Sequence, residues 1–168
     1  MSNFPHIFIS QAAMLQKVLP FMANATHYGK FQHVWARTAT ETESIHTYTS
    51  QGKETTRMAQ PGDFIVKNRT TAAEEYVVEA DKFHQRYQWL RNIAEGLDEY
   101  QPKGTVLALE CDAELQKQLA LGCPFEFEAA WGENQTVYTG DFLVCPPDKS
   151  EVYKISPVEF AQTYRPLP

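Results

Sequence analysis

Aromatic and apolar positions recur at the same spacings in two distant segments of the chain. Both segments open with Gly-Asp-Phe, at Gly62 and at Gly140, and continue with a Tyr, a Phe seven residues later and a second Tyr four residues after that. The aligned aromatic pairs are Phe64/Phe142, Tyr76/Tyr153, Phe83/Phe160 and Tyr87/Tyr164. Repeated hydrophobic spacing is first of all a packing signal, so the pattern predicts one structural unit that occurs twice.

The repeated unit is predicted to hold a hairpin, a turn, two strands joined by a loop, and a short helix. In the first copy, residues 45–49 and 54–58 flank Ser-Gln-Gly-Lys, which is a hairpin signal. Residues 60–63, Gln-Pro-Gly-Asp, fit a type II turn, because Pro sets the first φ and Gly supplies the positive φ that follows.

The two copies differ in how the short helix begins. In the first copy a helix is predicted from about residue 81, with Phe83, Tyr87 and Leu90 on one face. In the second copy, residues 156–159 read Ser-Pro-Val-Glu, a capping box with Pro at the first helical position. The second helix is therefore expected to start more sharply.

Strand and helix signals also precede each repeat. A strand at residues 6–9 is followed by a helix with Ser10 as N-cap, and residues 23–30 read as a loop. A second strand at 105–110 is followed by a helix that Asp112 caps. These pairs extend the predicted repeat toward its N-terminal side.

Together these elements predict an α+β protein formed by internal duplication of a small antiparallel β-sheet unit with short helices. The two units are expected to pack about a pseudo-twofold axis into a single compact body. Residues 1–90 form the first unit with its N-terminal strand and helix, 91–104 a linker, and 105–168 the second unit. The groove between the units is the expected pocket.

Composition and charge restrict the class of partner. With 43% apolar residues and a net charge of −6, the chain is acidic and typical of a soluble globular protein. Its Lys and Arg are scattered, which argues against nucleic acid, and no apolar run is long enough for a membrane helix. The start of the chain lacks a basic n-region, and three widely spaced cysteines favour a reducing, cytoplasmic compartment.

The sequence contains no signature of a metal or cofactor site. Its five histidines show neither HxH nor HExxH spacing, and no P-loop, GxGxxG or GxSxG motif occurs. We therefore expect no metal and no cofactor.

Asp63 and Asp141 are the candidate catalytic residues, because each follows the glycine of the repeated turn. As general bases they would need a partner group, and no His, Cys or second acid accompanies both copies. The alternative is that each carboxylate accepts hydrogen bonds from the amides of its own turn, and this alternative is favoured.

Other side chains are candidates for ligand binding. Tyr76 and Tyr153 recur in both copies and could line a stacking pocket, although a repeated aromatic core is the favoured interpretation. His84 adjoins the first helix, while Trp35 and Arg37 lie in an unrepeated His-Val-Trp-Ala-Arg segment. Trp and Arg can bind planar or anionic ligands, and they also occur on ordinary strand faces.

The residues from Pro61 to Val66, then Glu74 to Val78, then Phe83 to Tyr87 resemble the PGDYG-motif proteins, a family of bacterial and phage proteins. Residues 139–164 are similar to a second, looser copy of the motif, with Thr139 in place of the Pro. Tyr-Gly of the motif is replaced here by Phe-Ile and Phe-Leu. The resemblance implies a shape and carries over no catalytic residue.

Two functions from different classes remain open. The first is a non-catalytic binding or interaction module for a protein or small-molecule partner, which the missing catalytic signature favours. The second is a small enzyme that acts on a nucleotide- or sugar-like ligand in the groove between the units. It would use Asp63 or Asp141 with Tyr76, Tyr153 or His84, so convergence of the two carboxylates would favour it.

Overall fold

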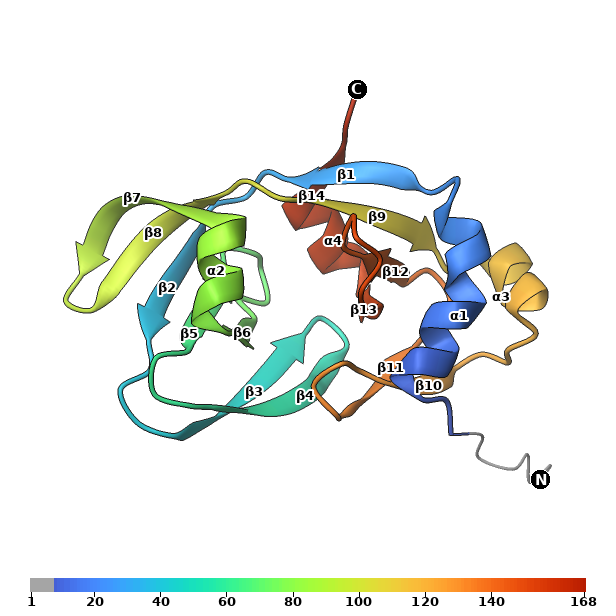
Figure 1. Cartoon of the computed structure of the whole chain (residues 1–168), viewed down its shortest axis with the longest axis horizontal. Coiled ribbons are helices and arrows are strands. Elements are labelled where there is room, and N and C mark those ends of the chain that lie inside the picture. Colours follow the sequence, from blue (N-terminus) through green and yellow to red (C-terminus); the bar gives the residue numbers. More distant parts are fainter. Residues whose placement is uncertain (1–7) are drawn as a thin grey trace.

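The computed structural model describes residues 8–168, and these confirm the predicted α+β class. Two five-stranded antiparallel sheets and two separate hairpins are accompanied by four helices within this range. Figure 1 shows the two sheets side by side, with strand β1 leading into β2 and strand β8 leading into β9 along the same side of the molecule. The chain therefore passes between the sheets at these two places.

The first sheet, here called sheet I, is built from the central part of the chain. Its strand order is β6 (Glu75–Val78), β5 (Phe64–Asn68), β2 (Val34–Thr38), β8 (Leu97–Pro102) and β7 (Tyr87–Ala94). Helix α2 (Ala80–Arg86) connects the two edge strands β6 and β7. Phe83 of this helix is fully buried in the apolar cluster of the sheet.

The second sheet, sheet II, combines both ends of the described chain. Its strand order is β13 (Tyr153–Ile155), β12 (Phe142–Cys145), β9 (Thr105–Glu110), β1 (Thr26–Lys30) and β14 (Tyr164–Pro166). Helix α4 (Pro157–Thr163) connects the edge strands β13 and β14. The order of connected elements in sheet II thus matches that in sheet I, except that β1 comes from the other end of the chain.

Two hairpins and two helices complete the structure. The hairpins are β3 (Glu43–Thr49) with β4 (Gly52–Ala59), and β10 (Phe125–Glu128) with β11 (Asn134–Val137). Helices α1 (Gln11–Met22) and α3 (Ala113–Leu119) share one buried apolar cluster with sheet II and the β10–β11 hairpin. Because α1 belongs to this core, the N-terminal region packs with the second half of the chain.

The two Gly-Asp-Phe turns have the same backbone geometry. Gly62 and Gly140 adopt φ values of 93° and 97°, which confirms the positive φ expected at this position. In each turn the Asp N–H donates to the carbonyl three residues earlier at 3.0 Å. Each turn delivers a Phe that stacks on the Phe of the following helix, with ring centroids 3.9 Å apart: Phe64 on Phe83, and Phe142 on Phe160.

Several local predictions are corrected. The predicted loop at 23–30 contains β1, whose polar residues are held by backbone hydrogen bonds to β9 and β14 on both sides. The predicted linker at 91–104 contains half of β7 and all of β8. Of the predicted strand at 6–9, residues 6 and 7 lie outside the described residues, and residues 8 and 9 belong to no strand.

The two repeated helices also end or begin differently from expectation. Helix α2 stops at Arg86, and Tyr87 has an extended φ of −134° because it opens strand β7, which pairs with β8. Ser156 and Glu159 form no capping box, since the Ser156 hydroxyl donates to Gln51 and the Glu159 carboxylate accepts from Ser50. The predicted caps at Ser10 and Asp112 are confirmed by side-chain hydrogen bonds at 3.1 and 2.8 Å.

Candidate functional site

A cavity of about 570 Å³ lies between the two sheets and is lined by both halves of the chain. Its wall is formed by the β3–β4 hairpin, β6 and α2 on one side, and by β13 and α4 on the other. The segment that passes from β8 to β9 and the loop after β12 close it further. The volume falls in the range of small-molecule sites.

Four tyrosines, here called the tyrosine cluster, meet in this cavity: Tyr76, Tyr87, Tyr153 and Tyr164. They are the two Tyr positions of each repeated segment. The Tyr76 and Tyr87 hydroxyls lie 2.8 Å apart. Burial raises the pKa of Tyr76, Tyr153 and Tyr164 well above the usual value for a phenol. These three phenols are therefore neutral hydrogen-bonding groups at physiological pH.

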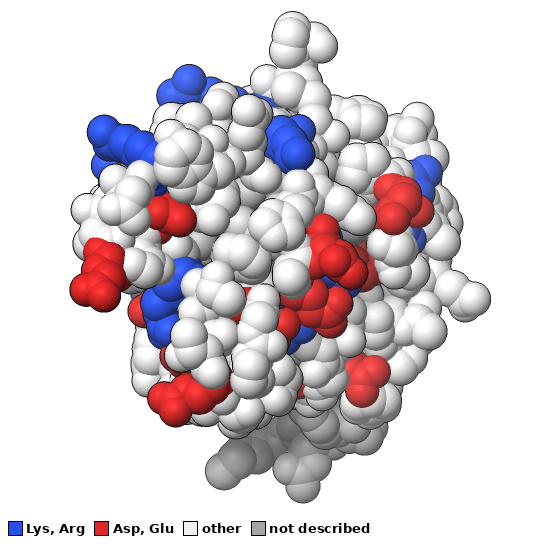
Figure 2. All heavy atoms as spheres, turned by 60° about the vertical axis from the view of Figure 1, so that its left-hand side comes forward, with Lys and Arg blue, Asp and Glu red and all other residues white. Residues whose placement is uncertain are grey.

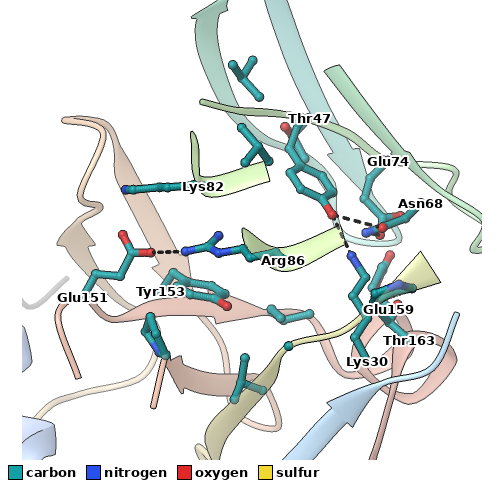
Figure 3. Close-up of a pocket in the computed structure, with 18 of the residues that line it drawn as sticks. Lys30, Thr47, Asn68, Glu74, Lys82, Arg86, Glu151, Tyr153, Glu159 and Thr163 are labelled. Carbon is teal, nitrogen blue, oxygen red and sulfur yellow. Dashed lines mark hydrogen bonds and ion pairs between the residues drawn. The ribbon is translucent and has the colours of Figure 1, made fainter. Parts of the chain in front are cut away.

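Lys30 is the cation that contacts Tyr76 and Tyr87 of the tyrosine cluster. It extends from the end of β1 in sheet II, and its Nζ donates to the Tyr76 and Tyr87 hydroxyls of sheet I, each at 2.7 Å. Its ammonium also lies 5.4 and 5.0 Å from the centroids of the same two rings. Figure 3 shows the Lys30 side chain among residues of both halves of the chain.

Lys154 and Glu54 form a buried ionic group in another part of the wall. Lys154 Nζ lies 3.2 Å from Asp141 Oδ2 and 3.5 Å from Glu54 Oε1, and it donates to Gln51 Oε1 at 2.8 Å. Burial raises the pKa of the Glu54 carboxyl to about 7, against the opposing effect of the Lys154 charge. Glu54 can therefore gain or lose a proton near neutral pH.

The tip of the β3–β4 hairpin reaches from the first half of the chain onto sheet II. Gln51 Nε2 donates to Asp141 Oδ1 at 2.9 Å, and the Ser50 hydroxyl donates to Glu159 Oε2 at 3.0 Å. Glu159 is 2% exposed and Asp141 is fully buried. These contacts fix the hairpin against α4 and keep one wall of the cavity in place.

Two polar atoms of residues in the wall have no partner in the protein. Among residues 8–168, the buried side-chain atoms without a hydrogen bond are Glu54 Oε1, Trp131 Nε1 and Thr163 Oγ1, of which Glu54 Oε1 is ion-paired with Lys154. All three residues line this cavity. Buried polar groups are normally satisfied, and an unsatisfied one costs about 1–3 kcal/mol. A molecule in the cavity that reached the Trp131 and Thr163 atoms would supply the missing partners.

The two predicted catalytic residues are not brought together. Asp63 Oδ2 accepts from the Gln60 N–H at 2.9 Å, and Asp141 Oδ2 accepts from the Tyr138 N–H at 2.8 Å, so each is bound to its own turn. Neither lines the cavity. This is the geometry expected of the structural alternative, although Asp141 has a second role as the partner of Lys154.

Of the predicted binding residues, only Tyr76 and Tyr153 line the cavity. His84 packs edge-on against Phe64 with ring centroids 5.3 Å apart. The Trp35 indole donates to Glu99 at 3.3 Å, and Arg37 donates to both carboxylate oxygens of Glu43. These three residues are engaged by neighbours on sheet I or at its edge, outside the cavity.

Four residues of the cavity wall could not be assigned from the sequence: Lys30, Glu54, Trp131 and Lys154. Lys30 lies in a segment that reads as a loop, and Glu54 occupies a hairpin position that resembles an ordinary surface one. Trp131 reads as part of the apolar face of a strand with Phe125 and Phe127, whereas β10 ends at Glu128. Lys154 carries a signal, because a Lys between Tyr153 and Ile155 interrupts a short apolar strand. A charge at such a position indicates a buried partner.

Residues 8–168 contain no group of three or more His, Cys, Asp or Glu side chains placed to hold a metal ion. None of their helices is long and apolar enough to cross a membrane. Figure 2 shows basic and acidic side chains dispersed over one face, with uncharged surface between them. This face therefore lacks the continuous basic surface that a nucleic-acid backbone requires.

Comparison of the chain with known protein families, curated proteins and solved structures found no match.

Proposed function

We propose that this protein is a binding module that holds a small polar molecule in the cavity between its two sheets. The observation that carries the proposal is the cavity of about 570 Å³ between the sheets, whose lining includes Trp131 and Thr163, two residues with a buried polar atom that no protein group hydrogen-bonds. An indole N–H only donates, whereas a hydroxyl can donate or accept. A ligand with acceptor groups would satisfy the indole, and a further polar substituent would satisfy the Thr163 hydroxyl.

We further propose that the two sheets are related by internal duplication. Support comes from the equal strand order, the equal turn geometry and the equal aromatic stacks. Under this proposal the cavity lies between two related units, and each unit contributes two Tyr residues at equivalent positions to the tyrosine cluster. The resemblance of both copies to PGDYG-motif proteins stays a prediction.

The test is retention of small molecules by the purified protein. Wild type and variants are dialysed to equilibrium against a bacterial metabolite extract, and the compounds enriched on the protein side are identified by mass spectrometry. We expect wild type to enrich at least one compound, and Trp131→Phe to lower that enrichment by about fivefold to tenfold, since about 1 kcal/mol is lost with the hydrogen bond.

Trp89→Phe is the matched control, because Trp89 is 56% exposed on β7 and does not line the cavity. It should enrich the same compounds as wild type. The proposal is wrong if wild type retains nothing, or if Trp131→Phe and Thr163→Val both retain the same compounds as strongly as wild type.

Catalysis on a nucleotide- or sugar-like ligand is the second candidate function, and one observation favours it. Glu54 faces the cavity with a pKa of about 7, which suits a general acid or base at neutral pH. Once a ligand is known, Glu54→Gln separates the two functions. An enzyme would lose turnover of that ligand and keep binding, whereas a binding module would leave the ligand chemically unchanged in both forms.

A further inference from the structure

Some of the charged residues of the cavity wall are ion-paired and others are not. Of its five carboxylates, Glu54, Glu79 and Glu151 are paired with Lys154, Arg57 and Arg86, whereas Glu74 and Glu159 accept from the uncharged Asn68 and Ser50. Its six cations are Lys30, Arg57, Lys82, Arg86, Lys103 and Lys154. Among the described residues, Lys30, Lys82 and Lys103 have no carboxylate within 4.0 Å.

Lys30 is the most constrained of these three lysines. Two of its N–H donors are directed to the Tyr76 and Tyr87 hydroxyls, and both acceptors are uncharged partners. Lys30 is half-buried, and neither group that holds its ammonium carries a formal charge. An anion beside Lys30 would compensate this charge and accept its third N–H.

Other donors favour the same kind of molecule. Trp131, whose buried indole N–H has no acceptor in the protein, lines the same cavity as the exposed Lys82 and Lys103. A ligand with acceptor atoms and negative charge could pair with these groups, whereas a cation would be repelled by the lysines.

We propose that the ligand of the cavity is a small organic anion whose phosphate or carboxylate group binds Lys30 beside the Tyr76 and Tyr87 hydroxyls. This inference rests on the proposed binding function and specifies the charge of the ligand and the residue that anchors it. Lys82 on α2 and Lys103 between β8 and β9 supply further positive charge along the wall. Phosphate and carboxylate share the chemistry that Lys recognises as a point charge.

The experiment compares each charged probe with its uncharged parent. Glucose 6-phosphate and glucose, AMP and adenosine, and citrate alone are titrated by thermal shift and calorimetry at millimolar concentrations. We expect at least one anion to raise the melting temperature while its parent does not, because a ligand stabilises the state that binds it. Added sodium chloride should weaken this binding.

Lys30→Gln keeps a hydrogen-bond donor near the tyrosines and removes the charge. It should lower the affinity for the anion at least about tenfold, and Lys30→Arg should restore part of the affinity. Lys17→Gln, on the exposed face of α1, is the matched control and should bind as wild type does. Circular dichroism establishes that each variant is folded before binding is measured.

The inference is overturned if neutral parents bind as strongly as the anions, if Lys30→Gln keeps full anion affinity, or if none of the anions binds. The metabolite dialysis distinguishes the two proposals. If the Trp131→Phe variant loses a neutral compound that the Lys30→Gln variant retains, the proposed binding function would be supported and the proposal of an anionic ligand would be wrong. A wild-type protein that retains no compound would remove the binding function itself.

Discussion

At the scale of single residues, the Glu54 carboxyl makes the free energy of unfolding depend on pH. Its carboxyl has an ordinary pKa near 4.5, and burial raises the pKa to about 7 in the folded protein. Between these two values the folded state binds a proton that the unfolded state has lost. The free energy of unfolding therefore falls as the pH rises from about 4.5 to about 7.

Glu54→Gln removes this titration. The difference in unfolding free energy between the variant and wild type should therefore shift in favour of the variant by roughly 2–3 kcal/mol from pH 5 to pH 8. Urea unfolding at both pH values measures the change. Glu95→Gln, at the exposed turn between β7 and β8, is the control and should follow wild type at both values. Equal pH dependence of wild type and Glu54→Gln would contradict the assignment.

The sequence predicts residues of the site only where repetition draws attention to them. Tyr76 and Tyr153 recur at aligned positions and do line the cavity. Lys30 contacts Tyr76, which is 46 positions away, and Lys154 reaches Gln51 across 103 positions. No local spacing encodes such pairs, because they depend on how the sheets pack.

At the scale of elements, the two Gly-Asp-Phe turns form a natural pair for comparison. Both Asp side chains accept from an amide of their own turn, but only Asp141 is fully buried and also accepts from Gln51 and Lys154. One local structure therefore occurs in two environments. The difference isolates the contribution of the buried ionic contacts from that of the turn.

Asp141→Asn should lower the free energy of unfolding by about 3 kcal/mol, because it leaves the Lys154 ammonium without its nearest carboxylate. Asp63→Asn should cost only about 0.5–1 kcal/mol, since it weakens one turn hydrogen bond. Chemical denaturation of both variants at neutral pH measures the two values. Equal destabilisation would show that the turn, and not the contact with Lys154, dominates.

Local chemistry also decides which elements the sequence predicts well. The turn at Gly62 follows from Pro, Gly and Asp preferences, and the structure confirms its positive φ; the turn at Gly140, with Thr139 in place of the Pro, has a positive φ as well. Strand β1, Thr-His-Tyr-Gly-Lys, has weak strand preference and becomes a strand only between β9 and β14. Helix α2 ends before the predicted face is complete because Tyr87 gains strand hydrogen bonds with β8.

At the scale of the whole molecule, the structural unit around sheet II is not one continuous stretch of the sequence. Residues 105–168 provide four strands of sheet II, and β1 supplies the strand between β9 and β14. Helix α1 adds Met14, Val18 and Met22 to the same core. The structural unit around sheet II is therefore 105–168 together with 8–30, whereas 34–102 holds all of sheet I.

This arrangement predicts how fragments fold. Residues 105–168 alone should be unfolded, because β14 would lose the strand that connects it to β9 and the core would lose α1. A permuted fragment, 105–168 joined to 8–30 by a flexible Gly/Ser linker of about 20 residues, restores every strand of sheet II. It should fold as a monomer with dispersed amide resonances and a cooperative unfolding transition.

The matched control joins residues 105–168 to residues 8–24 by the same linker, which keeps α1 and omits β1. If β1 is the strand that completes the sheet, this control should remain without cooperative unfolding. Cooperative folding of 105–168 alone, or of the control, would show that β1 is dispensable. In that case the passage of β1 into β2 would serve to place Lys30 at the tyrosine cluster, and the stability of sheet II would come from its own four strands.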